Sequence, residues 1–140
     1  MDKPIVFNTP EAAEQAFYNA FERADIDAMM SIWAPNESIV CIHPLGPRIF
    51  GTAAIKASWV RIFATEAHFA FTLSESQNTQ DSGLAVHMHK EKIEVDEVLR
   101  GVMLATNIYQ LINGSWRLIL HHASPEPQLK QATTGSHIVH

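Results

Sequence analysis

Hydrophobic and polar residues alternate along the stretch 101–125, which an Asn113-Gly114 pair divides into two runs. This pattern predicts a β-hairpin with a type I′ turn, because both central residues of that turn need positive φ. A two-residue turn also determines the register of the strands, starting from Ile112 opposite Ser115. The predicted pairs on one face are then Leu111 with Trp116, Tyr109 with Leu118, Asn107 with Leu120 and Ala105 with His122. That face is mostly apolar with a few polar points, as in the wall of a ligand pocket.

Two helices are predicted before residue 35. Thr9-Pro10 supplies a capping hydroxyl and a proline at the first helical position, which indicates a helix from there to about Ala24. Its apolar residues recur at i, i+3 and i+4, namely Ala13, Ala16, Phe17, Ala20, Phe21 and Ala24. Asp25 is placed to cap a second, shorter helix that ends before Pro35. These two segments predict a helical hairpin with one apolar stripe.

The middle of the chain predicts a strand, a helix and two further strands. Residues 38–44 are β-branched and short enough for a strand, and Gly51 opens a third helix. Residues 69–76 alternate as a half-buried strand should, and a polar turn follows them. The long strand 84–98 changes its apolar parity, which predicts a β-bulge near Lys90. Helices early and antiparallel strands late favour an α+β fold in which a curved sheet wraps the helices.

Composition agrees with one ordinary globular domain. The chain has 140 residues, of which 46% are hydrophobic and 18% charged, enough to bury a core. Its net charge of −5 and scattered basic residues argue against nucleic acid or an anionic membrane as a partner. No apolar run could cross a bilayer and the start lacks a signal peptide, so a cytoplasmic location is expected. We predict a single domain over residues 1–125 and a flexible tail over 126–140.

Four segments of the chain resemble one known superfamily. They are FERADIDAMMSIWA, HPLGPRIFGTAAI, ATNIY and WRLILHHASP, and they span roughly residues 10–125. Together they resemble the nuclear transport factor 2-like superfamily, to which SnoaL-like proteins and ketosteroid isomerases belong, and the last two resemble the SnoaL-like subgroup. The resemblance implies a cystatin-like, cone-shaped half-barrel around the helical hairpin and the third helix. It leaves the activity open, because the superfamily contains isomerases, hydratases, cyclases and non-catalytic binding or oligomerisation modules.

The resemblance extends to individual site residues. In ketosteroid isomerases the basic Asp stands in Asp-Pro-Val-Gly, shortly before Gly-Thr-Ala-Ala-Ile; here His43 begins the corresponding His-Pro-Leu-Gly. Asn107 stands where that family has the protonated acid that donates a hydrogen bond to the enolate oxygen. The family's helical Tyr aligns with Phe17, although Tyr18 is next to it. Since Phe cannot donate a hydrogen bond, steroid isomerisation itself is not expected.

These residues favour a small-molecule pocket with general acid–base chemistry of the isomerase, hydratase or cyclase class. An imidazole with a pKa near ~6.5 can take a proton at neutral pH, which makes His43 the candidate base. The Asn107 amide is the candidate donor to an oxyanion. Aromatic walls favour a flat, apolar, carbonyl-containing ligand without a cofactor. The predicted ligand-contacting residues are Phe17, Trp33, Trp59, Tyr109 and His122.

Other interpretations remain open at this stage. His43 could simply bond a backbone carbonyl, and Asn107 could brace His122, leaving a non-catalytic ligand-binding or dimerisation module. Cys41 lies on the same strand face as His43, so a nucleophilic Cys-His pair is an alternative. A metal-assisted enzyme is a third, because His87 and His89 share a strand face and Glu91 could add a ligand. The apolar Leu84, Val86 and Met88 indicate instead that these histidines face outward, and no metal site is predicted.

A homodimer is also expected. The outer face of the predicted hairpin carries Leu104, Ile108, Ile119 and Ala123, which is too apolar for a surface left in water. In the resembling superfamily this face of the sheet pairs two subunits. We therefore predict a C2 dimer through the outer sheet face.

Overall fold

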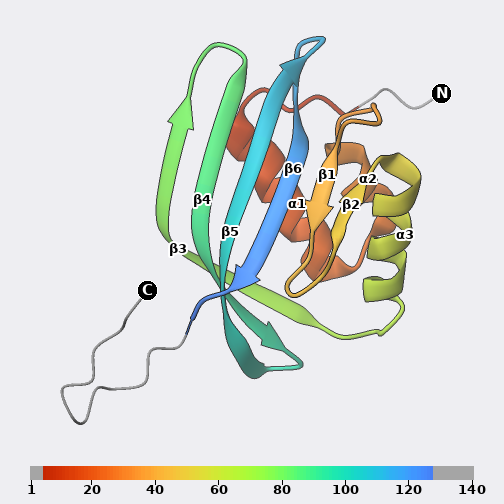
Figure 1. Cartoon of the computed structure of the whole chain (residues 1–140), viewed down its shortest axis with the longest axis vertical. Coiled ribbons are helices and arrows are strands. Elements are labelled where there is room, and N and C mark those ends of the chain that lie inside the picture. The colour runs from red at the N-terminus through yellow and green to blue at the C-terminus, as the bar shows by residue number, and fades with distance from the viewer. Residues whose placement is uncertain (1–4, 128–140) are drawn as a thin grey trace.

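Three helices cover one face of a curved, six-stranded sheet in the computed structural model, which describes residues 5–127 (Figure 1). In chain order the elements are α1 (Pro10–Arg23), α2 (Ile26–Ile32), β1 (Val40–Ile42), β2 (Arg48–Phe50), α3 (Thr52–Phe63), β3 (Phe69–Gln80), β4 (Leu84–Val95), β5 (Val98–Ile112) and β6 (Ser115–Pro125). The strand order is β2-β1-β6-β5-β4-β3. Only the β1–β6 pair among these neighbours is parallel, and the sheet does not close. The predicted α+β half-barrel is confirmed.

Local signals set the ends of the first two helices. The Thr9 hydroxyl oxygen accepts a hydrogen bond from the Ala12 N–H, and the Asp25 carboxylate accepts one from the Ala28 N–H, each at 3.0 Å. Between the helices Ala24 adopts a left-handed conformation with a φ of 53°, which ends α1. The predicted helical hairpin is confirmed.

Two short-range predictions in the sheet need correction. Between the predicted strand 38–44 and the predicted third helix no strand was expected, but Arg48–Phe50 form β2, with Cys41 paired to Ile49. Strand β3 continues to Gln80 through residues predicted as a polar turn. Because β3 is an edge strand, the polar side chains of its second half remain in water while the backbone pairs with β4.

Strand β4 keeps one parity throughout, so the predicted bulge near Lys90 in this strand is wrong. Its odd-numbered positions face the helices: Ala85, His87, His89 and Glu91 are buried. The register shift between β3 and β4 has its extra residue in β3, between Ser74 and Gln77, and the shift between β4 and β5 beside Ile93 has its extra residue in β5. Leu84 and Met88 face outward and are 40% and 42% exposed. His87 and His89, predicted to face outward, therefore face inward, where both lie beside the Glu14 carboxylate on α1.

The β5–β6 hairpin forms as predicted near its turn and then departs by one residue. Asn113 and Gly114 both have positive φ, and the predicted pairs hold as far as Tyr109 with Leu118. A register shift then opposes Ile108 to Leu120 and Asn107 to His121. The bulge thus turns His121 inward, and His122 is exposed rather than in the pocket as predicted.

The core lies between the helical stripe and the inner face of the sheet. Phe17, Trp59 and Leu118 are fully buried there. The Trp59 ring meets Phe17 and Phe21 edge-to-face, with centroid distances of 5.7 Å and 4.8 Å. Such aromatic pairs add to the stabilisation that burial of their area provides. This cluster holds α1, α3 and the sheet in one arrangement.

The end of the described chain is docked on the sheet. The Glu126 N–H donates to the Val102 carbonyl at 2.9 Å, and Lys90 Nζ donates to Glu126 Oε1 at 3.1 Å. The tail predicted from residue 126 lies outside the described residues from 128 onward. Within residues 5–127, none of the helices has the length and apolar character that a bilayer crossing requires.

Candidate functional site

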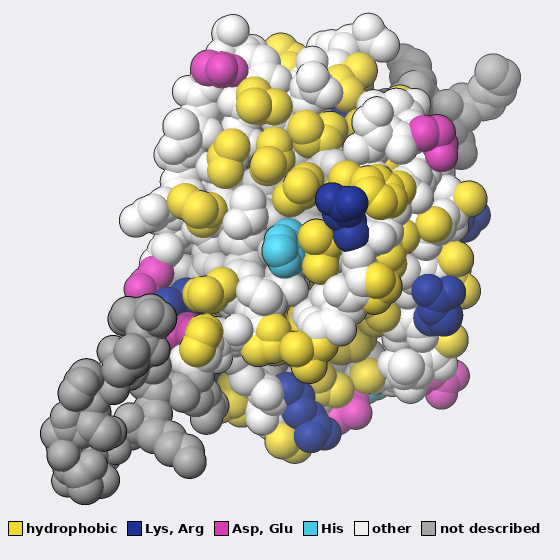
Figure 2. Space-filling view, in the orientation of Figure 1, with side chains coloured by type: hydrophobic (Ala, Val, Ile, Leu, Met, Phe, Trp, Pro, Cys, Tyr) yellow, Lys and Arg dark blue, Asp and Glu magenta, His cyan; other side chains and the backbone are white. Residues whose placement is uncertain are grey.

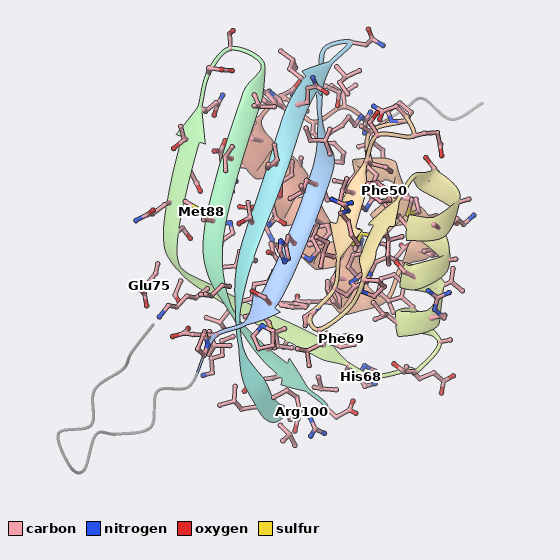
Figure 3. The ribbon with its side chains drawn as sticks, in the orientation of Figure 1. Phe50, His68, Phe69, Glu75, Met88 and Arg100 are labelled. Atoms are coloured by element: carbon pink, nitrogen blue, oxygen red, sulfur yellow. The ribbon has the colours of Figure 1, made fainter. Side chains whose placement is uncertain are left out.

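A cavity of about 310 Å³ lies between the last turns of α1 and α3 and the inner face of the sheet. Phe69, labelled in Figure 3 at the start of β3, is part of its wall. Most of the wall is apolar, with Phe21, Ile62 and Ile93 among its residues. Three titratable side chains interrupt it: His43, Glu91 and His121. An apolar cavity with a few converging polar groups is the usual form of a small-molecule site.

His43 follows directly after β1, and one hydrogen bond determines which of its nitrogens carries the proton. Ser58 donates its hydroxyl proton to the Ile55 carbonyl at 2.7 Å, so Ser58 Oγ must accept from His43 Nε2 at 2.9 Å. His43 Nδ1 is left without a hydrogen-bond partner among residues 5–127 and remains a proton acceptor. Burial, and secondarily the charge of Arg61, lowers the pKa of His43 to about 4. His43 is therefore neutral at pH 7.

His121 is held in the opposite tautomer. Its Nδ1 donates to Asn107 Oδ1 at 2.6 Å, which leaves Nε2 as the unprotonated nitrogen. Burial is the main reason that the pKa of His121 falls to about 3, and the charges of His43 and His122 add to it. The cavity thus holds two neutral imidazoles, each with one bare nitrogen.

Asn107 positions His121 instead of lining the cavity. Its amide nitrogen donates to Tyr18 Oη at 3.0 Å and to Glu14 Oε2 at 3.3 Å, and the residue is fully buried. Both amide protons are therefore engaged, so the predicted role as a donor to a substrate oxyanion does not fit this geometry. The bulge in β6 brings His121, rather than His122, against the Asn107 oxygen.

Glu91 is the site residue that the sequence interpretation missed, having considered it only as a metal ligand. It lies on the inner face of β4 and accepts a hydrogen bond from the Tyr18 hydroxyl. Burial raises the pKa of Glu91 to about 7, although the Tyr18 hydrogen bond acts in the opposite direction. The sequence did contain a signal for this position. If β4 is taken as a strand without a bulge, strict alternation places Glu91 on the same face as His87 and His89.

The remaining predicted contact residues belong to the core behind the cavity. Phe17, Trp33, Trp59 and Tyr109 are each at most 3% exposed and are not part of the cavity wall. Phe17 and Trp59 still support the histidines of the cavity. The Trp59 ring packs edge-to-face on His43 with a centroid distance of 4.7 Å, and the Phe17 ring packs on His121 with a centroid distance of 4.9 Å. Burial raises the pKa of Cys41 to about 12, so this thiol stays protonated and the nucleophile alternative is not supported.

A second group of buried polar side chains surrounds Glu14 on α1. The Tyr109 hydroxyl donates to Glu14 Oε2 at 3.1 Å, and His87 Nδ1 donates to Glu14 Oε1 at 3.0 Å. Burial alone would raise the pKa of Glu14, but its contacts with His87 and His89 outweigh burial and lower this pKa to about 2. Glu14, His87 and His89 are also the described residues whose types and spacing suit a metal ion. Asn107 connects this group to His121 and so to the cavity.

A curved sheet that packs against three helices, with an apolar cavity between sheet and helices, is the fold of nuclear transport factor 2-like proteins. Residues 11–127 match the model of the SnoaL-like domain, so the chain belongs to the SnoaL-like family, as predicted. The chain resembles a Thiobacillus denitrificans structure provisionally described as a calcium/calmodulin-dependent protein kinase type II association domain, with 37% identity and a TM-score of 0.83. That match covers 88% of this chain and 99% of the other.

Two further similar proteins carry different descriptions, one as an enzyme and one as an F-box protein. A nuclear transport factor 2-like protein from Streptomyces avermitilis, provisionally described as a dehydratase, is 27% identical with a TM-score of 0.77 and covers 84% of this chain and 94% of its own. The F-box protein SKIP8 of Arabidopsis thaliana is 27% identical over 108 residues, or 77% of this chain. The chain spans 46% of the length of SKIP8, so the match concerns one part of that protein.

Proposed function

We propose that the protein binds a small, apolar, carbonyl-containing molecule in the cavity beside His43 and moves a proton on it, as isomerases, hydratases and cyclases do. The observation that carries the proposal is that two neutral imidazoles of opposite tautomer, His43 and His121, reach one apolar cavity together with the partly protonated carboxyl group of Glu91. Groups whose environments separate their pKa values in this way suit acid and base roles at one pH.

Each group has a distinct role in this proposal. Glu91, with a pKa of about 7, is about half protonated at neutral pH and can donate a hydrogen bond to the ligand oxygen. His43 Nδ1 is bare and serves as the proton acceptor. His121 Nε2 accepts a hydrogen bond from the ligand, and Asn107 fixes its orientation. The description of the Streptomyces avermitilis relative as a dehydratase belongs to the same class of acid–base chemistry.

Hydrogen exchange on a simple ketone tests this function. 2-Tetralone is a flat, apolar ketone, and loss of a proton next to its carbonyl appears in D₂O as deuterium incorporation measured by NMR. We expect the wild-type protein to accelerate this exchange, and His43→Ala to lower the rate by about 100-fold while ligand binding stays nearly intact. The exposed His122 provides the matched control, because His122→Ala should exchange at the wild-type rate. Equal rates in His43→Ala and His122→Ala would refute the proposal.

Self-association through the outer sheet face is a second candidate function, favoured by exposed apolar side chains. Leu84, Met88 and Leu104 are 40%, 42% and 41% exposed. Figure 2 shows hydrophobic side chains gathered over this face, and Figure 3 labels Met88. Two of the residues predicted for this face belong elsewhere: Ala123 is buried, and Ile119 packs against the core at the bulge. The Thiobacillus denitrificans relative is described as an association domain.

Charge introduced on this face tests the dimer. We expect the wild-type protein to sediment as a dimer at micromolar concentration. The Met88→Glu/Leu104→Glu double variant should weaken association by at least about 100-fold, because four carboxylates would meet across the two-fold axis. Leu45→Glu is the control, since Leu45 is 92% exposed in the β1–β2 turn. A monomeric wild-type protein, or a double variant that remains dimeric, would contradict the prediction.

A further inference from the structure

Two histidines on β4 and one glutamate on α1 converge outside the cavity described above. His87 and His89 are alternate residues of the strand, so both project from its inner face toward α1. One ligand atom from each of Glu14, His87 and His89 lies within 4.8 Å of the others. All three side chains are buried. The sheet and the helix therefore bring three metal-ligating groups to one point.

Both histidines have a buried nitrogen whose hydrogen-bonding capacity is unused. His87 Nδ1 donates to Glu14 Oε1 at 3.0 Å, and His87 Nε2 lies 3.5 Å from Glu11 Oε2. His89 Nε2 is 2.8 Å from Glu14 Oε2 without the alignment of a hydrogen bond. Neither Nε2 atom has a hydrogen-bond partner in the described part of the chain. A buried polar atom without a partner is costly, and a cation shared by these nitrogens and the carboxylate would remove that cost.

The groups behind these side chains hold them as ligands are usually held. His89 Nδ1 is 2.6 Å from Ser76 Oγ, so Ser76 can accept its proton and keep Nε2 bare. Tyr109 and Asn107 donate to Glu14 Oε2. Hydrogen bonds of this kind orient histidine and carboxylate ligands in metal sites.

An open approach to the cluster also exists. A cavity of about 360 Å³ reaches Glu14, and its wall carries two further carboxylates, Glu11 and Glu22. Glu11 is 60% exposed, so it is free to turn toward a cation as an additional ligand. The acidic wall attracts cations and the volume admits water ligands. These features give a cation a route as far as the Glu14 carboxylate.

We propose that Glu14, His87 and His89 bind one divalent transition-metal ion of borderline softness, with Zn²⁺ as the best match. Two imidazoles and one carboxylate with an open position are a ligand set that Zn²⁺ takes in proteins. Harder ions such as Mg²⁺ and Ca²⁺ prefer sites made of oxygen ligands alone. This inference does not use His43, Glu91 or His121, the three titratable residues of the proposed catalytic cavity.

Titration of the full chain tests the site. The purified protein is stripped with a chelator and titrated with Zn²⁺ by calorimetry, and with Co²⁺ while the visible absorption spectrum is recorded. We expect one Zn²⁺ per chain and visible Co²⁺ bands. The His87→Gln/His89→Gln double variant should bind Zn²⁺ at least about 100-fold more weakly. His68→Gln/His122→Gln removes the same number of histidines elsewhere and should bind like the wild type.

A milder variant keeps the test valid if the double variant does not fold. Ser76→Ala leaves all three ligands in place and removes only the partner of His89 Nδ1, so we expect Zn²⁺ affinity to fall by about 10-fold or more. Absence of Zn²⁺ binding by the wild type would overturn the proposal. Unchanged affinity in both His87→Gln/His89→Gln and Ser76→Ala would also overturn it, because the bound ion would then lie elsewhere.

Discussion

Replacing Glu14 by leucine is expected to lower the free energy of unfolding by about 3–5 kcal/mol at pH 7 in the presence of a chelator. The Glu14 carboxylate accepts hydrogen bonds from His87, Tyr109 and Asn107 in the interior. Leucine fits the space but accepts none of these bonds, so three buried donors lose their partner. Urea denaturation followed by circular dichroism measures the effect.

The neighbouring residue provides the control for this substitution. Gln15 is exposed and bonds only to the exposed Asn19 in the described structure, so Gln15→Leu should change the free energy of unfolding by less than about 0.5 kcal/mol. Equal stability of Glu14→Leu and Gln15→Leu would mean that the buried polar cluster does not stabilise the fold.

Stability is expected to fall by about 2 kcal/mol as the pH drops from 7 to 5, as the sum of opposing contributions from three cavity residues. Folding lowers the pKa of His43 from 6.5 to about 4 and that of His121 from 6.5 to about 3. Below pH 6.5 both histidines therefore become protonated in the unfolded chain while they stay neutral in the folded protein, and this difference favours unfolding. Folding raises the pKa of Glu91 from 4.5 to about 7, so the folded protein binds one extra proton between these values, which favours folding.

Removal of the opposing group separates these contributions. In Glu91→Gln the stabilising proton uptake is absent, and the loss of stability between pH 7 and 5 should double to about 4 kcal/mol. Urea denaturation at several pH values measures both slopes. A Glu91→Gln slope no steeper than that of the wild type would show that Glu91 is ionised in the folded protein at pH 5.

Prediction from the sequence succeeded where short-range interactions decide the structure. The Thr9 and Asp25 caps and the Asn113-Gly114 turn each involve residues within a few positions of one another. The cavity position of His43 followed from the resemblance of its loop to that of ketosteroid isomerases, and its catalytic role stays a prediction.

Prediction failed where a single register or parity decision depended on distant partners. The bulge after Leu118 turns His121 inward in place of His122, and no residue of β6 gives a local signal that predicts this bulge. The inward direction of His87 and His89 depends on Glu14, which is 73 positions away from His87. Taking the apolar Leu84 and Met88 as the buried side was therefore reasonable locally and wrong globally.

The amino-acid sequence by itself determined the family, the helical hairpin and the terminal β-hairpin, because caps, turn residues and apolar periodicity act within a few residues of one another. Only the tertiary structure decided which polar side chains enter the interior. A polar group is stable there when a partner from another element meets it, and Glu14 on α1 and Asn107 on β5 are such partners for His87 and His121. Since those partners are distant in the chain, the site around them emerges only when the sheet wraps the helix.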